Sequence, residues 1–172
     1  MIFLGRKLKK SCRNIQTDGR AVIAGIIIIL FAGILVRLLS GSPVIMLRVT
    51  GLWGKIPKIW FFTVTWTLWY ILLGFSFGFI LGTKAPGKSI YKYKGSFWFV
   101  IMMIFNIIWY PLFFKAGAMF LALTDILLII VFCILCGLEY FKIQKIIGCI
   151  MLLHVLWLIW CFILNVKALL SI

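Results

Sequence analysis

Residues 21–36 read AVIAGIIIILFAGILV, sixteen consecutive residues without a charge, an amide or a hydroxyl group in their side chains. A strand of a membrane β-barrel alternates apolar and polar residues over about 10 positions, and this stretch shows no alternation. A helix is the other structure that satisfies its backbone hydrogen bonds within a membrane. Because roughly 20 helical residues cross a hydrocarbon core of about 30 Å, the stretch and its flanks predict a transmembrane helix.

The composition of the whole chain extends this interpretation beyond the first apolar run. Of the 172 residues, 65% are hydrophobic and 12% are charged, and the mean hydropathy is +1.22. Soluble domains carry about 45–50% apolar residues. Five crossings would use about 100 residues, which leaves too few for a large catalytic domain outside the membrane. The sequence therefore predicts an all-α integral membrane protein, a five-transmembrane-helix bundle.

Charged and turn-forming residues divide the chain into a head and a membrane domain. Residues 1–20 form a basic head that is expected in the cytoplasm, and residues 21–166 form the five-helix domain. A mixed segment, 40–59, is expected to fold over the membrane face as a lid. The helices are predicted at about 21–39, 60–82, 96–114, 118–140 and 146–166.

The distribution of charge predicts an orientation in the membrane. The chain has 18 Lys and Arg residues against 3 acidic residues, and twelve of these cations fall on one side of the predicted bundle and six on the other. The positive-inside rule then places the N-terminus in the cytoplasm and the C-terminus outside. The Ile- and Lys-rich composition favours a bacterial cytoplasmic membrane. No nucleic-acid partner is expected, because no basic stretch is interleaved with stacking aromatics.

Glycines at four-residue spacing mark one face of the second predicted helix. Gly74, Gly78 and Gly82 would let a neighbouring helix approach closely, as small residues do in membrane proteins. That neighbour could belong to the same bundle or to a second protomer. The alternative is that the glycines are simply tolerated in an apolar helix.

Aromatic and polar side chains recur at helical spacing on three predicted helices. Each series falls on one face of its helix. The three series are Phe62, Trp66 and Tyr70, then Asn106, Trp109 and Phe113, then His154, Trp157 and Cys161. Converging faces of this kind would enclose an aromatic-walled cavity for a flat, largely apolar ligand. The same periodicity is also typical of ordinary packing between helices.

Polar side chains at bilayer depth are candidates for function, because an unpaired polar group costs several kcal/mol there. Asp125 could be a structural carboxyl group or could contact a proton or a ligand. His154 could bind a porphyrin iron, donate a hydrogen bond or be structural. Cys133-x-x-Cys136 lacks the sequence context of a metal site. Without a recognisable catalytic motif, the sequence predicts neither catalytic residues nor a metal.

The order of several short motifs resembles that of the translocator proteins, also called peripheral-type benzodiazepine receptors or tryptophan-rich sensory proteins. On the second helix the family pattern is matched by Pro57, Trp60, Phe62, Trp66, Thr67, Tyr70 and Gly74. Later blocks are matched by Phe105, Asn106, Trp109, Phe113 and Phe114, by Ala122, Leu123 and Asp125, and by Trp157 and Asn165. The chain departs from the pattern at Thr63, Met102 and Leu153-His154.

This resemblance implies a five-helix bundle, usually a homodimer, with a pocket between the helices beneath the first loop. It implies binding of porphyrins, haem intermediates or sterol-like molecules as ligands, with no cofactor required. Family pocket positions correspond to Trp66, Asn106, Trp109, Phe113 and Trp157. The aromatic spacing adds Phe62, Tyr70 and His154 to the predicted ligand-binding residues.

Three functions are compatible with these observations. The leading interpretation is a membrane receptor or transport-type protein that binds a porphyrin or a sterol-like hydrophobic molecule. The second is an enzyme that degrades porphyrin in light with the help of a pocket tryptophan, as the resemblance implies for bacterial relatives. The third is a ligand-free membrane scaffold held together by the glycine face.

Overall fold

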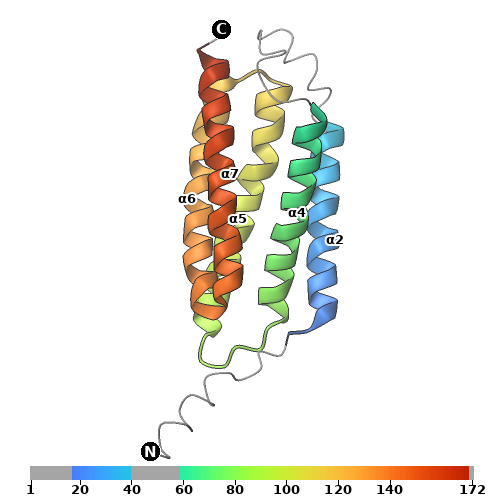
Figure 1. The fold of residues 1–172 in the computed structure, drawn as a ribbon, viewed down its shortest axis with the longest axis vertical. Helices are drawn as coiled ribbons and strands as arrows, with labels where there is room; N and C mark the ends of the chain where they lie inside the picture. The colour runs from blue at the N-terminus through green and yellow to red at the C-terminus, as the bar shows by residue number, and fades with distance from the viewer. Residues whose placement is uncertain (1–16, 40–58, 171–172) are drawn as a thin grey trace, which may run out of the picture.

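The computed structural model describes residues 17–39 and 59–170. Within them it forms five helices, α2 (Gly19–Leu39), α4 (Ile59–Gly82), α5 (Ser89–Phe114), α6 (Met119–Ile143) and α7 (Lys145–Leu169) (Figure 1). Each helix is long and apolar enough to cross a membrane. The prediction of an all-α five-helix membrane bundle is confirmed. Residues 1–16 of the expected head and residues 40–58 of the expected lid lie outside the described residues.

Several helix ends differ from their predicted positions, most of all the start of the third helix. The third helix begins at Ser89 rather than at about residue 96, so that Gly95 lies inside it. A Cβ atom on Gly95 would lie 2.6 Å from the Tyr140 ring, which shows that this glycine serves close packing and does not end a helix. A single extended residue, Gln144, joins α6 to α7, where the sequence predicted a link over 141–145. The apolar limits of these segments predicted the membrane span, and the helices continue beyond it.

Two glycines form the turns at the ends of α4 and α5. Gly87 has a φ of 78° and Gly117 has a φ of 62°. This left-handed conformation costs a residue with a Cβ about 1–2 kcal/mol and costs glycine almost nothing. Both residues fall where the sequence predicted a helix to stop, in Lys84-Ala85-Pro86-Gly87 and in Lys115-Ala116-Gly117.

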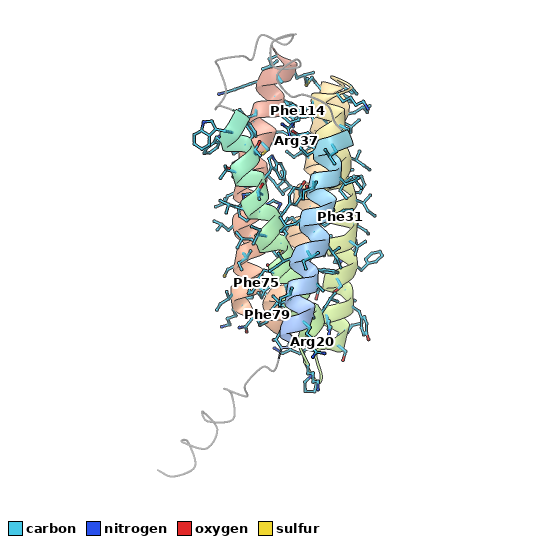
Figure 2. The ribbon with its side chains drawn as sticks, turned by 90° about the vertical axis from the view of Figure 1, so that its right-hand side faces the viewer. Arg20, Phe31, Arg37, Phe75, Phe79 and Phe114 are labelled. Atoms are coloured by element: carbon cyan, nitrogen blue, oxygen red, sulfur yellow. The ribbon has the colours of Figure 1, made fainter. Side chains whose placement is uncertain are left out.

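The five helices form a close pair and a close trio (Figure 1). The pair is α2 packed along α4, and in the trio α6 packs against both α5 and α7. The backbones of the pair and the trio approach each other far less closely, and aromatic side chains such as Trp66 and Trp109 meet between them. Large apolar side chains are exposed along the helices, including Phe31 of α2, which is 66% exposed (Figure 2). Such a surface suits lipid, and the protein is a multi-pass membrane protein.

Small residues bring the backbones of α2 and α4 into contact. A Cβ atom on Gly78 would lie 2.4 Å from the carbonyl oxygen of Ala21. A Cβ atom on Gly25 would lie 2.6 Å from the carbonyl oxygen of Gly74. The glycine face predicted from the sequence is therefore filled by α2 of the same chain. The sequence left open whether the neighbouring helix belongs to the same bundle or to a second protomer, and here it belongs to the same bundle.

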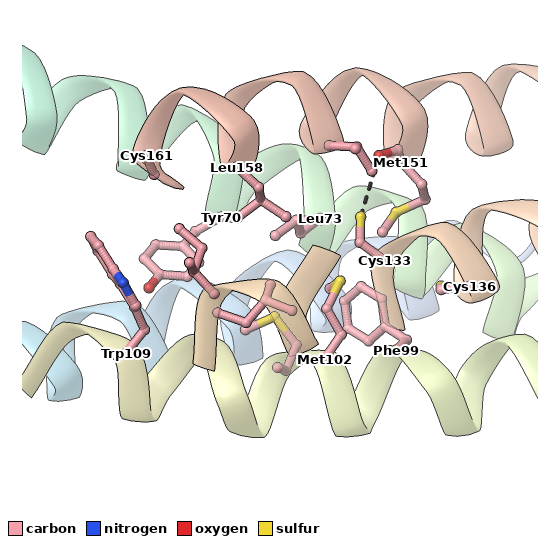
Figure 3. Packing of buried hydrophobic residues seen from close by; sticks show 14 of the residues in the cluster. Tyr70, Leu73, Phe99, Met102, Trp109, Cys133, Cys136, Met151, Leu158 and Cys161 are labelled. Atoms are coloured by element: carbon pink, nitrogen blue, oxygen red, sulfur yellow. Dashed lines mark hydrogen bonds between the residues drawn. The ribbon is translucent and has the colours of Figure 1, made fainter. Parts of the chain in front are cut away.

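Apolar side chains that are almost wholly buried fill the trio. Figure 3 shows Phe99 and Met102 of α5 beside Cys133 of α6 and Met151 and Leu158 of α7. The Cys133 thiol donates a hydrogen bond to the Met151 carbonyl oxygen at 3.3 Å. This cysteine therefore helps to join α6 to α7.

Two polar residues singled out by the sequence are also buried, Asp125 in α6 and Asn165 in α7. Oδ2 of Asp125 has no hydrogen-bond partner within the described residues. The same is true of both side-chain amide atoms of Asn165. Neither residue lines the cavity described below, so both lie outside the candidate site.

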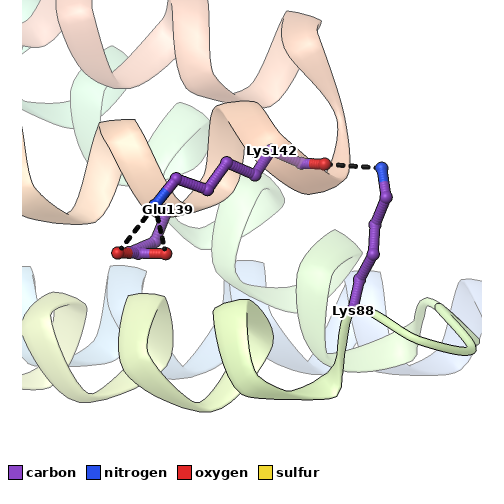
Figure 4. Close-up of polar contacts among 3 residues, drawn as sticks. All are labelled: Lys88, Glu139 and Lys142. Atoms are coloured by element: carbon purple, nitrogen blue, oxygen red, sulfur yellow. Dashed lines mark hydrogen bonds and ion pairs between the residues drawn. The ribbon is translucent and has the colours of Figure 1, made fainter.

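Lysines tie helix ends together at the end of the bundle where α2 begins. The Lys88 ammonium donates a hydrogen bond to the Lys142 carbonyl oxygen at 2.5 Å (Figure 4). Lys142 in turn forms an ion pair with Glu139, with an N–O distance of 3.1 Å. The last carbonyl groups of a helix lack partners within it. Lys88 therefore satisfies one such group at the end of α6.

Candidate ligand-binding cavity

Large rings on α4 separate its first half from α2. Phe62, Trp66 and Tyr70 follow one another at four-residue spacing and share a face of the helix. The Tyr70 ring lies directly against Gly33 of α2, where a Cβ atom would be 2.5 Å from the ring. Helices α2 and α4 are therefore in close contact along the half that contains the glycines, and aromatic side chains separate them along the other half.

The space between these helices and α5 is a cavity of about 290 Å³. Ligand pockets usually hold about 300–1,000 Å³, so this cavity lies at the small end of the range. It lies at the end of the bundle where α2 ends and α4 begins. Its lining consists of Leu30, Gly33, Ile34, Val36, Arg37, Leu38, Phe62, Thr63, Trp66, Thr67, Tyr70, Tyr110 and Phe114.

Trp66 forms the centre of the aromatic wall of this cavity. Its ring centroid lies 5.8 Å from Tyr70, 5.7 Å from Trp109 and 6.0 Å from Trp157. These spacings fall in the range of favourable aromatic pairs. The indole N–H of Trp66 is buried and has no hydrogen-bond partner in the described part of the chain. This donor is enclosed within the wall, so Trp66 offers the cavity its aromatic surface.

Tyr70 and Asn106 form a polar contact beneath this wall. The Tyr70 hydroxyl donates a hydrogen bond to the Asn106 side-chain oxygen at 3.3 Å. Nδ2 of Asn106 is buried without a partner among the residues the structure describes. Tyr70 therefore contacts Gly33 of α2 and Asn106 of α5, and it lines the cavity.

Arg37 is the one charged side chain in the cavity lining that the structure describes. Its Nη1 atom donates a hydrogen bond to the Tyr110 hydroxyl oxygen at 2.5 Å, and its Cζ atom lies 5.9 Å from the Tyr110 ring centroid. Figure 2 places Arg37 beside Phe114 at this end of the bundle. The aromatic spacing in the sequence did not identify Arg37 as a site residue. A charged residue inside the last turn of an apolar helix is the signal that could have identified it.

The predicted ligand-binding residues divide into cavity lining and supporting core. Phe62, Trp66 and Tyr70 line the cavity. Behind them, Trp109 stacks on Phe113, with ring centroids 5.3 Å apart. The face predicted on the third helix thus packs against the aromatic wall, and the opposite side of the cavity comes from α2.

The residues predicted on the fifth helix lie on the other side of α4. The Trp157 ring stacks on Trp160, with ring centroids 4.7 Å apart, and packs edge-on against Phe62, with ring centroids 6.4 Å apart. His154 is completely buried, 4.6 Å from Trp69 between ring centroids. Neither His154 nitrogen has a hydrogen-bond partner within the described residues. The three aromatic faces therefore do not all open into one hollow, and His154 packs in the core away from the cavity.

The model of the TspO/MBR family matches residues 25–170. The chain belongs to the TspO/MBR family. The resemblance found in the sequence motifs is confirmed, and the matched range includes every residue that lines the cavity. No curated protein matches the chain.

Membership of the TspO/MBR family agrees with the architecture. Five membrane-spanning helices are the family's fold, and the described residues form five such helices. In this chain the cavity lining combines an aromatic wall on α4 with a guanidinium group on α2.

Proposed function

We propose that this TspO/MBR protein is a receptor or transport-type protein that holds a flat, largely apolar ligand in the cavity between α2, α4 and α5. Porphyrins are the first candidates and sterol-like molecules the second. The observation that carries the proposal is the aromatic wall of the cavity, formed by Phe62, Trp66 and Tyr70. A flat, apolar ring can pack against such a wall.

The size of the cavity favours partial enclosure of such a ligand. With about 290 Å³ available, one edge of a porphyrin would enter between α2 and α4 and the remainder would extend beyond the described lining. Stacking on Trp66 would add about 0.5–1.5 kcal/mol to the gain from apolar burial. The porphyrin is proposed as a ligand and not as a resident cofactor.

A fluorescence titration tests this proposal. Protoporphyrin IX added to the purified protein in neutral detergent should quench tryptophan fluorescence saturably. Trp66→Leu should weaken the affinity, measured from the porphyrin absorbance so that loss of an indole does not alter the readout. Trp60→Leu is the matched control, because Trp60 is 63% exposed and does not line the cavity. No saturable binding by the wild-type protein would refute the proposal.

We also propose an orientation with the N-terminus in the cytoplasm of a bacterial cell and the C-terminus outside. Among the described residues, seven cations lie at the end where α2 begins and three at the other end. The seven are Arg20, Lys84, Lys88, Lys92, Lys94, Lys142 and Lys145, and the three are Arg37, Lys115 and Lys167. The positive-inside rule supports this orientation, which places the cavity towards the outer face.

A homodimer is proposed from the family resemblance alone. Because α2 fills the glycine face of α4 within the protomer, a second copy would have to pack on another face. The same contact removes the basis of the scaffold interpretation, which needed those glycines between protomers.

A further inference from the structure

The charge of Arg37 has no carboxylate side chain to balance it anywhere in the chain. The sequence contains three acidic residues, Asp18, Asp125 and Glu139, and the structure describes all of them. Oδ1 of Asp18 accepts a hydrogen bond from the Arg20 backbone N–H at 2.9 Å, at the other end of α2. None of the three lines the cavity.

The remaining two acidic residues are also placed away from Arg37. Glu139 is paired with Lys142 at the far end of the bundle. Asp125 is buried in α6 and forms no ion pair with Arg37. Arg37 is exposed, so an anion that enters the cavity can reach its guanidinium group. The cavity therefore has a cation and an apolar wall but no anion of its own.

Tyr110 holds this cation at the cavity. The side chain of an arginine near a helix end ordinarily extends towards the lipid headgroups. Here the hydrogen bond to the Tyr110 hydroxyl, at 2.5 Å, directs it across to α5. Tyr110 is itself fixed by Phe114, with ring centroids 4.6 Å apart. A guanidinium carries five N–H donors, and the bond to Tyr110 uses one of them.

We propose that Arg37 recognises a carboxylate on the edge of the ligand and that Tyr110 is its positioning residue. Guanidinium and carboxylate groups form short, often bidentate, hydrogen bonds that are stronger than neutral ones. The cavity would then select planar molecules bearing an acid over the same molecules without one. This inference rests on the proposed function and narrows its ligand class to carboxylate-bearing porphyrins, because a sterol's hydroxyl cannot balance the charge.

A matched pair of ligands tests the inference. Protoporphyrin IX carries two carboxylates, and its dimethyl ester has the same ring with both charges removed. Their dissociation constants should be measured from the porphyrin absorbance, with protein in neutral detergent that contains no anionic lipid. The wild-type protein should bind the acid about tenfold or more tightly than the ester, which is the size expected for a hydrogen-bonded charge.

Three variants assign this preference to its residues. Arg37→Gln should bring acid and ester to similar affinity by weakening the acid alone, and Tyr110→Phe should reduce the preference partly. Lys167→Gln is the control for general charge attraction, since Lys167 lies at the same end of the bundle and outside the lining. It should keep the wild-type preference. If Tyr110 had only a structural role, Tyr110→Phe would weaken the binding of both ligands equally and leave the ratio of their dissociation constants unchanged.

The outcomes separate this inference from the proposed function. Saturable binding of acid and ester with equal affinity by the wild-type protein would overturn the role of Arg37 and leave the proposed function standing. That result would mean that Arg37 serves a headgroup phosphate or the end of α2. No saturable binding of either molecule would refute the proposed function itself. If Arg37→Gln does not fold, the comparison of the two ligands on the wild-type protein still decides.

Discussion

Replacing Gly78 with alanine should force α2 and α4 apart. The new Cβ atom would lie 2.4 Å from the Ala21 carbonyl oxygen and 2.7 Å from the Cα atom of Val22. Carbon and oxygen atoms in close C–H···O contact are about 3.3–3.6 Å apart. The helices must therefore separate by about 1 Å, because the opposing atoms belong to the backbone and cannot rotate away.

The expected cost follows from two opposed effects. Overpacking of this kind costs typically about 1–3 kcal/mol, and alanine recovers roughly 0.5–1 kcal/mol over glycine within a helix. The upper part of the first range, about 2–3 kcal/mol, applies because the opposing atoms are backbone atoms, so the net loss in the free energy of unfolding should be about 1–2.5 kcal/mol. For a chain of this size that corresponds to a fall in Tm of roughly 2–10 °C.

Thermal unfolding in a mild detergent, followed by tryptophan fluorescence, measures this effect. Gly19→Ala is the matched control on α2, because no atom lies within 4 Å of its added Cβ. It should unfold at or slightly above the wild-type temperature. An unchanged Tm for Gly78→Ala would mean that the two helices do not approach as closely as described.

Three further outcomes follow from individual contacts. Gly33→Ala should weaken ligand binding more than it lowers Tm, because its Cβ would lie 2.5 Å from the Tyr70 ring, which can move. A porphyrin titration and a thermal unfolding curve of the same variant check this, and equal losses of binding energy and of stability would contradict it. Tyr70→Phe removes the 3.3 Å hydrogen bond to Asn106 and should cost about 0.5–1.5 kcal/mol in unfolding, whereas an unchanged stability would show that this bond is not formed. Glu139→Gln should change Tm very little, because its partner Lys142 is 47% exposed and such pairs contribute about 0–1 kcal/mol; a large fall would show that the pair is shielded from water.

The sequence predicted the helices well because hydrophobic length is set by the membrane. It placed the start of the third helix at about residue 96, where the apolar run begins, whereas α5 begins at Ser89 and includes Gly95, which packs against Tyr140. The sequence also contained the partner of the glycine face. Gly25 on α2 meets Gly74, but spacing alone does not say which helix will pack on which.

The candidate site could be predicted only in part. The spacing of Phe62, Trp66 and Tyr70 correctly placed these rings on one face. Residues that share a helix face can line a cavity or pack against another helix, and the spacing does not distinguish the two. On α7 the same spacing includes His154, which is buried in the core. The wall on α2 is mostly aliphatic and has no aromatic signal, so Arg37 was its only distinctive mark in the sequence.

Blocking the cavity from α2 tests the central claim most directly. Ile34 and Ile28 lie on the same helix and are 58% and 59% exposed, but only Ile34 lines the cavity. Ile34→Trp should fill it and weaken protoporphyrin IX binding, measured from the porphyrin absorbance, while Ile28→Trp should bind like the wild-type protein. Equal, unchanged affinity in both variants would show that the ligand does not occupy the space between α2, α4 and α5.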